Sequence, residues 1–438
     1  MKISNLKKNI VDFLIKVIKS EEYKHLRIVY VVAFVFSIIV TLFGAKGGGD
    51  TGSYFLAKDL IIKGSFDHFR TPLYPVFLAF TYKWSTTIFF QWLIFFVSIA
   101  YLYRTLENIT ISPRLIFISV IMYVCHPIFI YYQTQIIPEG LCISLCSILA
   151  YYLVAFIKTE KISYCWIFHI IILFLILLKP GCIFLLVISL TLLFYFIFTK
   201  RKLVLSYIFP FLLIFLFIGS YGFVIKKTYY VYSLSSVSDI NLYWMFRERG
   251  KINVNLIKDD SVRNFVSNKV DIKYENSEEY IEEANTIFNR YGWKELHNVV
   301  QISLKMNLLD KKLLKIKNNL NGFVGKSIDN FGFRNSIRKY DYFTNCFPYF
   351  NFFTLIFLLL FYSILIAKHT YTVRSIPIIS VLFLLCIAAN FGSLILTAPN
   401  NYGRLIVPSI SIILIVGVQC LEWFALFIRK KEKEFRLV

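Results

Sequence analysis

Long apolar blocks alternate with short polar or basic stretches along most of this 438-residue chain. A helix that crosses a membrane needs about 17–25 mainly apolar residues, because the hydrocarbon core is roughly 30 Å thick. The blocks that reach this length predict about ten membrane-spanning helices and therefore an all-α polytopic membrane protein. They are residues 28–45, 87–105, 114–132, 139–157, 163–178, 181–198, 203–225, 348–367, 375–396 and 405–428.

The placement of Lys and Arg tests this count, since basic residues gather on the cytoplasmic side of membrane helices. With the N-terminus inside, every basic cluster beside a short loop falls on the cytoplasmic side, including the last one at Arg429–Lys431. The apolar run at 73–84 is too short to cross, and a crossing there would put Lys200–Lys202 outside. We therefore expect 73–84 to be a half-inserted or surface helix on the outer side, and both termini to be cytoplasmic.

The resulting topology divides the chain into five parts. Residues 1–27 show no cleavage pattern, and their apolar helical face predicts an amphipathic helix on the cytoplasmic surface before a retained first span. The long polar stretch has helical periodicity, so we expect helices packed on the outer membrane face. The parts are the N-terminal segment 1–27, the membrane domain 28–225 with its first outer loop 46–86, the outer insertion 226–345, the C-terminal spans 346–428 and the basic tail 429–438.

Composition agrees with a membrane protein: 57% of the residues are apolar and 17% are charged, against about 45–50% and 25% in soluble domains. The net charge of +22 comes from Lys and Arg that flank apolar blocks, so it indicates membrane topology and lipid contact instead of nucleic-acid binding. The eight cysteines show no metal-ligand spacing. No cofactor is evident, and a divalent metal stays open although no ligand cluster supports one.

Charged residues close to a bilayer are costly and are candidates for function. The first outer loop begins with Gly47–Gly49, which permit tight turns, and Asp50 then precedes a helical stretch. Asp50 could cap that helix or serve as a catalytic carboxylate. Arg70 lies just before Pro72 and the predicted half-helix, where it could grip a phosphate or reach for lipid headgroups.

Further candidates lie in other turns on the predicted outer side. Glu139 follows Pro138 in the first turn of a span, where a carboxylate could favour the helix dipole or act as a second acid. Lys179 and Arg404 are cations that could hold a phosphate. Weaker candidates for substrate contact are Tyr54, His68, Tyr74 and Tyr402.

One or two carboxylates and several cations at a membrane surface suit the transfer of a group from a phosphate to an acceptor. A carboxylate would take the proton of the acceptor, and the cations would stabilise the charge that develops on the phosphate. The sequence has no nucleophile elbow, Walker motif or metal-binding motif. Since nucleotide sugars are not expected outside the cytoplasm, the donor would be carried on a lipid.

The stretch Gly49–Tyr54 and the stretch Arg70-Thr71-Pro72-Leu73-Tyr74-Pro75 resemble the first outer loop of GT-C glycosyltransferases. The nearest branch contains the protein O-mannosyltransferases and the lipid A aminoarabinose transferases. The resemblance implies a sugar carried on a polyprenyl phosphate such as undecaprenyl phosphate, Asp50 as the base, inversion at the sugar carbon, and cations near the donor phosphate. Many relatives have an Asp-Glu pair where this chain has Asp50-Thr51, which shifts the second acid to Glu139.

Two other functions remain as alternatives. A polysaccharide polymerase of the O-antigen type also has many spans and outer arginines, but it does not need the Gly-rich Asp loop. A transporter or flippase of lipid or sugar would show internal repeats and charges at mid-membrane, and neither is evident. The favoured interpretation is a membrane glycosyltransferase of cell-envelope polysaccharide or lipopolysaccharide biosynthesis. It would lie in the bacterial inner membrane with its active site facing the periplasm or exterior, and its acceptor would be a glycan, lipid or protein.

Overall fold

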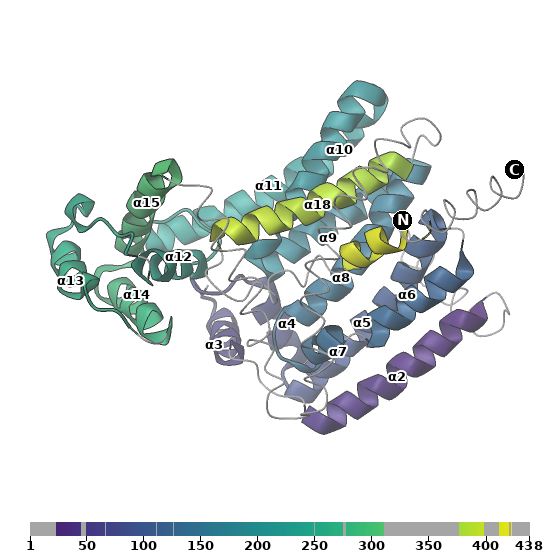
Figure 1. Ribbon diagram of the computed structural model, residues 1–438, viewed down its shortest axis with the longest axis horizontal. Coiled ribbons are helices and arrows are strands. Elements are labelled where there is room, and N and C mark those ends of the chain that lie inside the picture. Colours follow the sequence, from purple (N-terminus) through teal and green to yellow (C-terminus); the bar gives the residue numbers. More distant parts are fainter. Residues whose placement is uncertain are drawn as a thin grey trace, which may run out of the picture.

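The computed structural model describes residues 23–310, 376–397, 411–419 and 422, except 45–49, 66, 111, 126, 249 and 275–276. Within these ranges every regular element is helical (Figure 1). Several predictions lie outside the described residues: the span at 348–367, most of the span at 405–428, nearly all of the N-terminal segment and the basic tail. The described part is therefore an all-α arrangement, as the apolar pattern predicted.

Five helical stretches in the described part are long and apolar enough to cross a membrane. Their position along the chain follows the predicted apolar blocks, which supports a membrane-embedded protein. They are α2 (Lys24–Gly44), α5 (Trp84–Ile109), α8 (Glu139–Thr159), the continuous stretch of η2 (Pro180–Leu185) and α10 (Leu186–Thr199), and α11 (Arg201–Tyr229).

Shorter apolar helices complete the described bundle. The predicted span at 114–132 consists of two helices, α6 (Pro113–Cys125) and α7 (Pro127–Thr134). A new helix begins at Pro127 because proline lacks the backbone N–H and fits the first turn of a helix better than its interior. The others are α9 (Ile162–Leu178) and α18 (Ile376–Thr397).

The first loop contains two short helices, and the second of them lies within the short apolar run at 73–84. Helix α3 covers Thr51–Ile62, and α4 covers Leu73–Thr81. At 1.5 Å per residue, the 9 residues of α4 extend only about 13 Å, less than half the hydrocarbon thickness. The chain then turns at Tyr82, which has a positive φ of 57°, and α5 begins two residues later. The predicted half-helix is thus present as a separate short element.

Helix α8 lies at the centre of the bundle, since most of its side chains are buried and it packs on both α5 and α9. A row of buried hydroxyl groups links it to its neighbours. Tyr123 on α6 contacts Ser98 of α5 at 3.2 Å and Ser147 of α8 at 3.0 Å, and Ser147 donates to Ser411 at 3.0 Å. Such polar contacts hold helices together where lipid removes the hydrophobic driving force between them.

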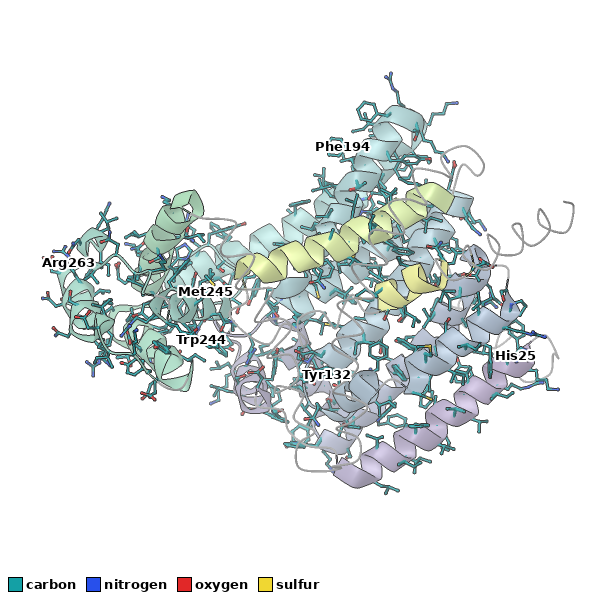
Figure 2. All side chains as sticks on the ribbon, in the orientation of Figure 1. His25, Tyr132, Phe194, Trp244, Met245 and Arg263 are labelled. Atoms are coloured by element: carbon teal, nitrogen blue, oxygen red, sulfur yellow. The ribbon has the colours of Figure 1, made fainter. Side chains whose placement is uncertain are left out.

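The predicted insertion is described up to Asp310, and this part forms a second group of helices beside one end of the bundle (Figure 1). Its remainder, 311–345, lies outside the described residues. The group contains α12 (Val237–Glu248), η3 (Val254–Leu256), α13 (Asp260–Val270), α14 (Ser277–Tyr291) and α15 (Trp293–Asp310). These helices have their own apolar core around Tyr243, Phe246 and Leu296. Arg263 marks the far side of this group, and His25 near the start of α2 lies at the opposite end of the molecule (Figure 2).

Candidate functional site

Asp50 occupies the N-cap position of α3, but its side chain makes no capping hydrogen bond. The carboxylate Oδ1 instead lies 2.8 Å from Nη2 of Arg70. The Asp50 side chain is 31% exposed, whereas that of Arg70 is 10% exposed. The side chain of Asp50 therefore does not cap the helix, and its carboxylate remains accessible next to a cation.

The guanidinium of Arg70 is held on all sides by residues of the first loop. Nε donates to Ser53 Oγ at 2.9 Å, and Nη1 lies 3.5 Å from the hydroxyl of Tyr54. The rings of Tyr54 and Phe69 lie 4.4 and 4.6 Å from the guanidinium carbon, within the range of cation–π contacts. Arg70 is thus fixed within the protein beside Asp50 instead of extending towards lipid headgroups.

A second carboxylate and cation meet where two helices end. Glu139 opens α8, and Lys179 follows the last residue of α9 in extended backbone. Nζ of Lys179 lies 3.0 Å from Oε1 of Glu139, and the two side chains are 12% and 0% exposed. An ion pair that is this deeply buried is stable only when both partners are present.

Hydrogen bonds next to these residues tie the two pairs together. Thr51, adjacent to Asp50, donates to the carbonyl of Ile136 at 3.2 Å, close to the start of α8. Thr71, adjacent to Arg70, donates to the carbonyl of Leu178 at 3.2 Å, next to Lys179. The first loop is therefore attached to both chain segments that carry the second pair.

A buried tyrosine and glutamine lie between the two pairs. The ring of Tyr74 on α4 packs edge-on against Tyr54 with centroids 5.0 Å apart, and it also lies within electrostatic range of Glu139. Its hydroxyl donates to Oε1 of Gln91 at 2.9 Å. The amide of Gln91 then donates to the carbonyl of Gln133, at the end of α7, and to that of Gln135, in the turn before α8. Sequence reasoning missed Gln91, although a lone amide in an apolar span is the kind of costly polar group that signals a role.

The ring of His68 contacts residues of the insertion. Its ring stacks on Phe288 at 4.2 Å between centroids, and Nδ1 lies 3.0 Å from Ser236 Oγ. Burial lowers the pKa of His68, partly offset by the nearby Asp67. We predicted a substrate contact for this residue, but the structure places it in the interface between loop and insertion. The predicted site residues Tyr402 and Arg404 lie outside the described residues.

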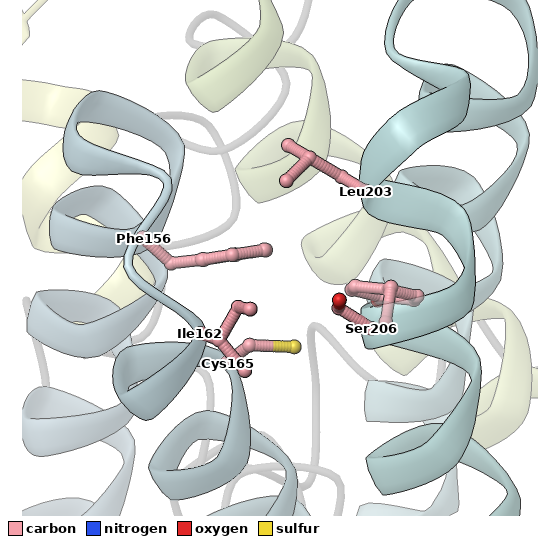
Figure 3. A pocket seen from close by; sticks show the side chains of 6 residues that line it. Phe156, Ile162, Cys165, Leu203 and Ser206 are labelled. Atoms are coloured by element: carbon pink, nitrogen blue, oxygen red, sulfur yellow. The ribbon is translucent and has the colours of Figure 1, made fainter.

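A small hollow elsewhere in the bundle does not extend this site. It is a shallow depression between α8, α9 and α11, lined by Phe156, Ile162, Cys165, Leu203, Ser206 and Tyr207 (Figure 3). Its lining carries no charged side chain. Ile162 begins α9 whereas Lys179 follows its end, so the hollow and the ion pairs are separated by about 25 Å along the helix.

The site thus contains two ion pairs, one half-exposed and one buried, connected by loop hydrogen bonds. Within the described ranges, no three His, Cys, Asp or Glu side chains come together as metal ligands would. The half-exposed carboxylate could accept a proton, and the two cations could contact an anion. Comparison with the models of known protein families, with curated proteins and with solved structures gave no match for this chain.

Proposed function

We propose that this protein is an inverting glycosyltransferase that moves a sugar from a polyprenyl phosphate to an acceptor on the outer face of a bacterial inner membrane. The observation that carries the proposal is the Asp50–Arg70 pair, attached through its own loop to the Glu139–Lys179 pair. The apolar helices around the site suit a donor whose lipid chain stays in the bilayer. The insertion end of the bundle would face the periplasm or exterior, and both termini would be cytoplasmic.

In the proposed reaction, a hydroxyl or amine of the acceptor attacks the sugar carbon that is bonded to the donor phosphate. The new bond to the acceptor forms on the face opposite the breaking carbon–oxygen bond, so the configuration inverts. Asp50 takes the proton of the acceptor, as a general base placed within hydrogen-bonding distance would. The polyprenyl phosphate leaves with the electron pair of the broken bond.

The charge on the phosphate determines what the cations contribute. A sugar-linked polyprenyl phosphate carries one negative charge, and the released phosphate monoester carries up to two. Arg70 and Lys179 would therefore interact more strongly with the transition state than with the bound donor, which is the condition for lowering the barrier. In the structure, each of these cations contacts a carboxylate. Binding of the phosphate to Arg70 would free Asp50 for its role as base.

Exposure distinguishes the roles of the two carboxylates. Asp50 is 31% exposed and can meet an acceptor, whereas the side chain of Glu139 is fully buried. A buried carboxylate with a cation at 3.0 Å is better placed to hold Lys179 in position than to take a proton. We therefore favour Asp50 as the base and Glu139 as a positioning residue, a narrower role than the second catalytic acid considered from the sequence.

The proposal is tested by transfer assays in membranes with a panel of polyprenyl-phosphate sugars. We expect wild type to transfer one of them, and Asp50→Asn to lose at least about 100-fold in rate, which is the lower range for loss of a general base. Asp59→Asn is the matched control, because Asp59 lies on the same helix, is 58% exposed and pairs only with the neighbouring Lys58 among the contacts described. Equal activity of Asp50→Asn and Asp59→Asn would refute the role of Asp50. If wild type transfers no sugar from the whole panel, a polymerase or flippase becomes the better explanation.

A further inference from the structure

The segment from Asp67 to Arg70 is a tight turn held by its own side chain. The carboxylate of Asp67 accepts the backbone N–H of Phe69 at 3.1 Å and that of Arg70 at 3.0 Å. Asp67 is only 7% exposed. This turn fixes the backbone at Arg70, so the position of the turn determines where the guanidinium lies.

The turn is attached to the insertion at two consecutive residues. The backbone N–H of Ser236 donates to the carbonyl of His68 at 2.8 Å, and the hydroxyl of Ser235 donates to the carbonyl of Phe69 at 2.6 Å. The His68 ring completes the attachment through Ser236 Oγ. Ser235 and Ser236 directly precede α12, so the first turn of the insertion and the turn before Arg70 form one hydrogen-bonded unit.

Aromatic packing adds to this attachment. His68 stacks on Phe288 of α14, meets Tyr229 edge-on at 5.3 Å and lies 6.2 Å from Trp293 of α15. Phe69 packs against the apolar core of the insertion, and its ring also covers the guanidinium of Arg70 at 4.6 Å. A continuous series of contacts thus runs from the insertion core through Phe69 to Arg70 and on to Asp50.

We propose that His68 and Phe69 are positioning residues through which the insertion holds Arg70 against Asp50. Their effect on transfer rests on the proposed function, whereas the anchoring itself does not. The insertion contributes no side chain to the two ion pairs described above, yet it donates hydrogen bonds to the backbone carbonyls of the two residues that precede Arg70. A guanidinium that must meet a phosphate in a fixed geometry needs such support, because a shift of about 1 Å can cost on the order of 100-fold in rate.

Hydrogen exchange tests the anchoring without any assumption about the reaction. We expect His68→Ala and Ser236→Ala to raise the exchange of the Phe69 and Arg70 amides by about tenfold, as the loss of one net hydrogen bond would. His68→Phe keeps the stacked ring and loses the bond to Ser236, so it separates the two contacts in a folded protein. Asn298→Ala is the control, because Asn298 is exposed on α15 and contacts only Glu295 among the interactions described. Unchanged exchange in both His68→Ala and Ser236→Ala would overturn the anchoring.

A double-mutant comparison tests whether His68 acts through Arg70. We expect His68→Ala to lower kcat/KM for the lipid-phosphate donor by at least about tenfold, and His68→Ala with Arg70→Ala to be no worse than Arg70→Ala alone. If the losses from His68→Ala and Arg70→Ala multiply in the double variant, or if His68→Ala is fully active, the positioning role is contradicted. The transferase proposal would stay intact. If wild type transfers no sugar, the transferase proposal fails, and the exchange result alone decides whether the insertion holds this turn.

Discussion

Removal of Lys179 gives a quantitative test of the buried ion pair. Lys179→Met keeps most of the side-chain volume but leaves the Glu139 carboxylate fully buried without the cation at 3.0 Å. At that distance and an effective dielectric of about 20, the attraction between unit charges is roughly 5 kcal/mol. The loss of one partner of a buried pair costs about 3–5 kcal/mol, because the remaining charge stays desolvated. We therefore expect a clear loss of thermal stability in Lys179→Met.

The coupling between the two residues distinguishes an ion pair from simple loss of packing. Replacement of both charges, in Lys179→Met with Glu139→Gln, removes the buried carboxylate together with its cation, so we expect the double variant to be more stable than Lys179→Met. Unfolding of the purified proteins in detergent measures all three variants, and Asp59→Asn is the exposed control, with an expected effect within about 1 kcal/mol. Strictly additive effects of the two substitutions, or a stability of Lys179→Met within about 1 kcal/mol of wild type, would refute this reasoning.

Three further predictions follow from single residues. Arg247 is 3% exposed and donates to Glu283 and to carbonyls at the end of α13. Its replacement by Met should lower stability by about 3–5 kcal/mol. The insertion should then be proteolysed faster than in Arg263→Ala. Gln91→Leu removes the link to the turn before α8 and should lower transfer activity with little change in protein level, and wild-type activity would contradict it. A hydrogen bond to Asp239 raises the pKa of His297, so its stabilising effect is complete below pH about 6.5 and is lost as pH rises through the higher folded pKa. Wild type should thus exceed His297→Asn in stability by more at pH 6 than at pH 9, and a constant or reversed difference would refute this.

The apolar blocks predicted the helical elements well because burial in lipid requires both length and apolar composition. The blocks that became α2, α5, α8 and α11 lie within a few residues of the observed helices. The division of 114–132 into α6 and α7 was missed, although Pro127 gave a physical signal for it. A hydropathy pattern reports apolar length, and it does not show where a proline begins a new helix.

The site was only partly predictable. The sequence indicated Asp50 and Arg70 as residues of one loop. Their contact at 2.8 Å depends on how that loop folds back on itself, because about 20 residues of chain separate them. The pairing of Glu139 with Lys179 joins two helix ends that are 40 residues apart, which no local pattern encodes. The contacts of His68 with Phe288 and Trp293 were not predictable, because these partners belong to a distant part of the chain.

Binding of a short-chain polyprenyl phosphate is the sharpest test of whether this site recognises a lipid-borne phosphate, because it requires no knowledge of the sugar or acceptor. We expect wild type to bind the phosphate and the corresponding alcohol not to compete. We also expect that Arg70→Ala and Lys179→Ala each weaken binding by about 10- to 100-fold, the value of a charge-assisted hydrogen bond, whereas Asp59→Asn does not. Equal binding of phosphate and alcohol, or wild-type affinity in Arg70→Ala, would contradict the claim that this site recognises a lipid-borne phosphate.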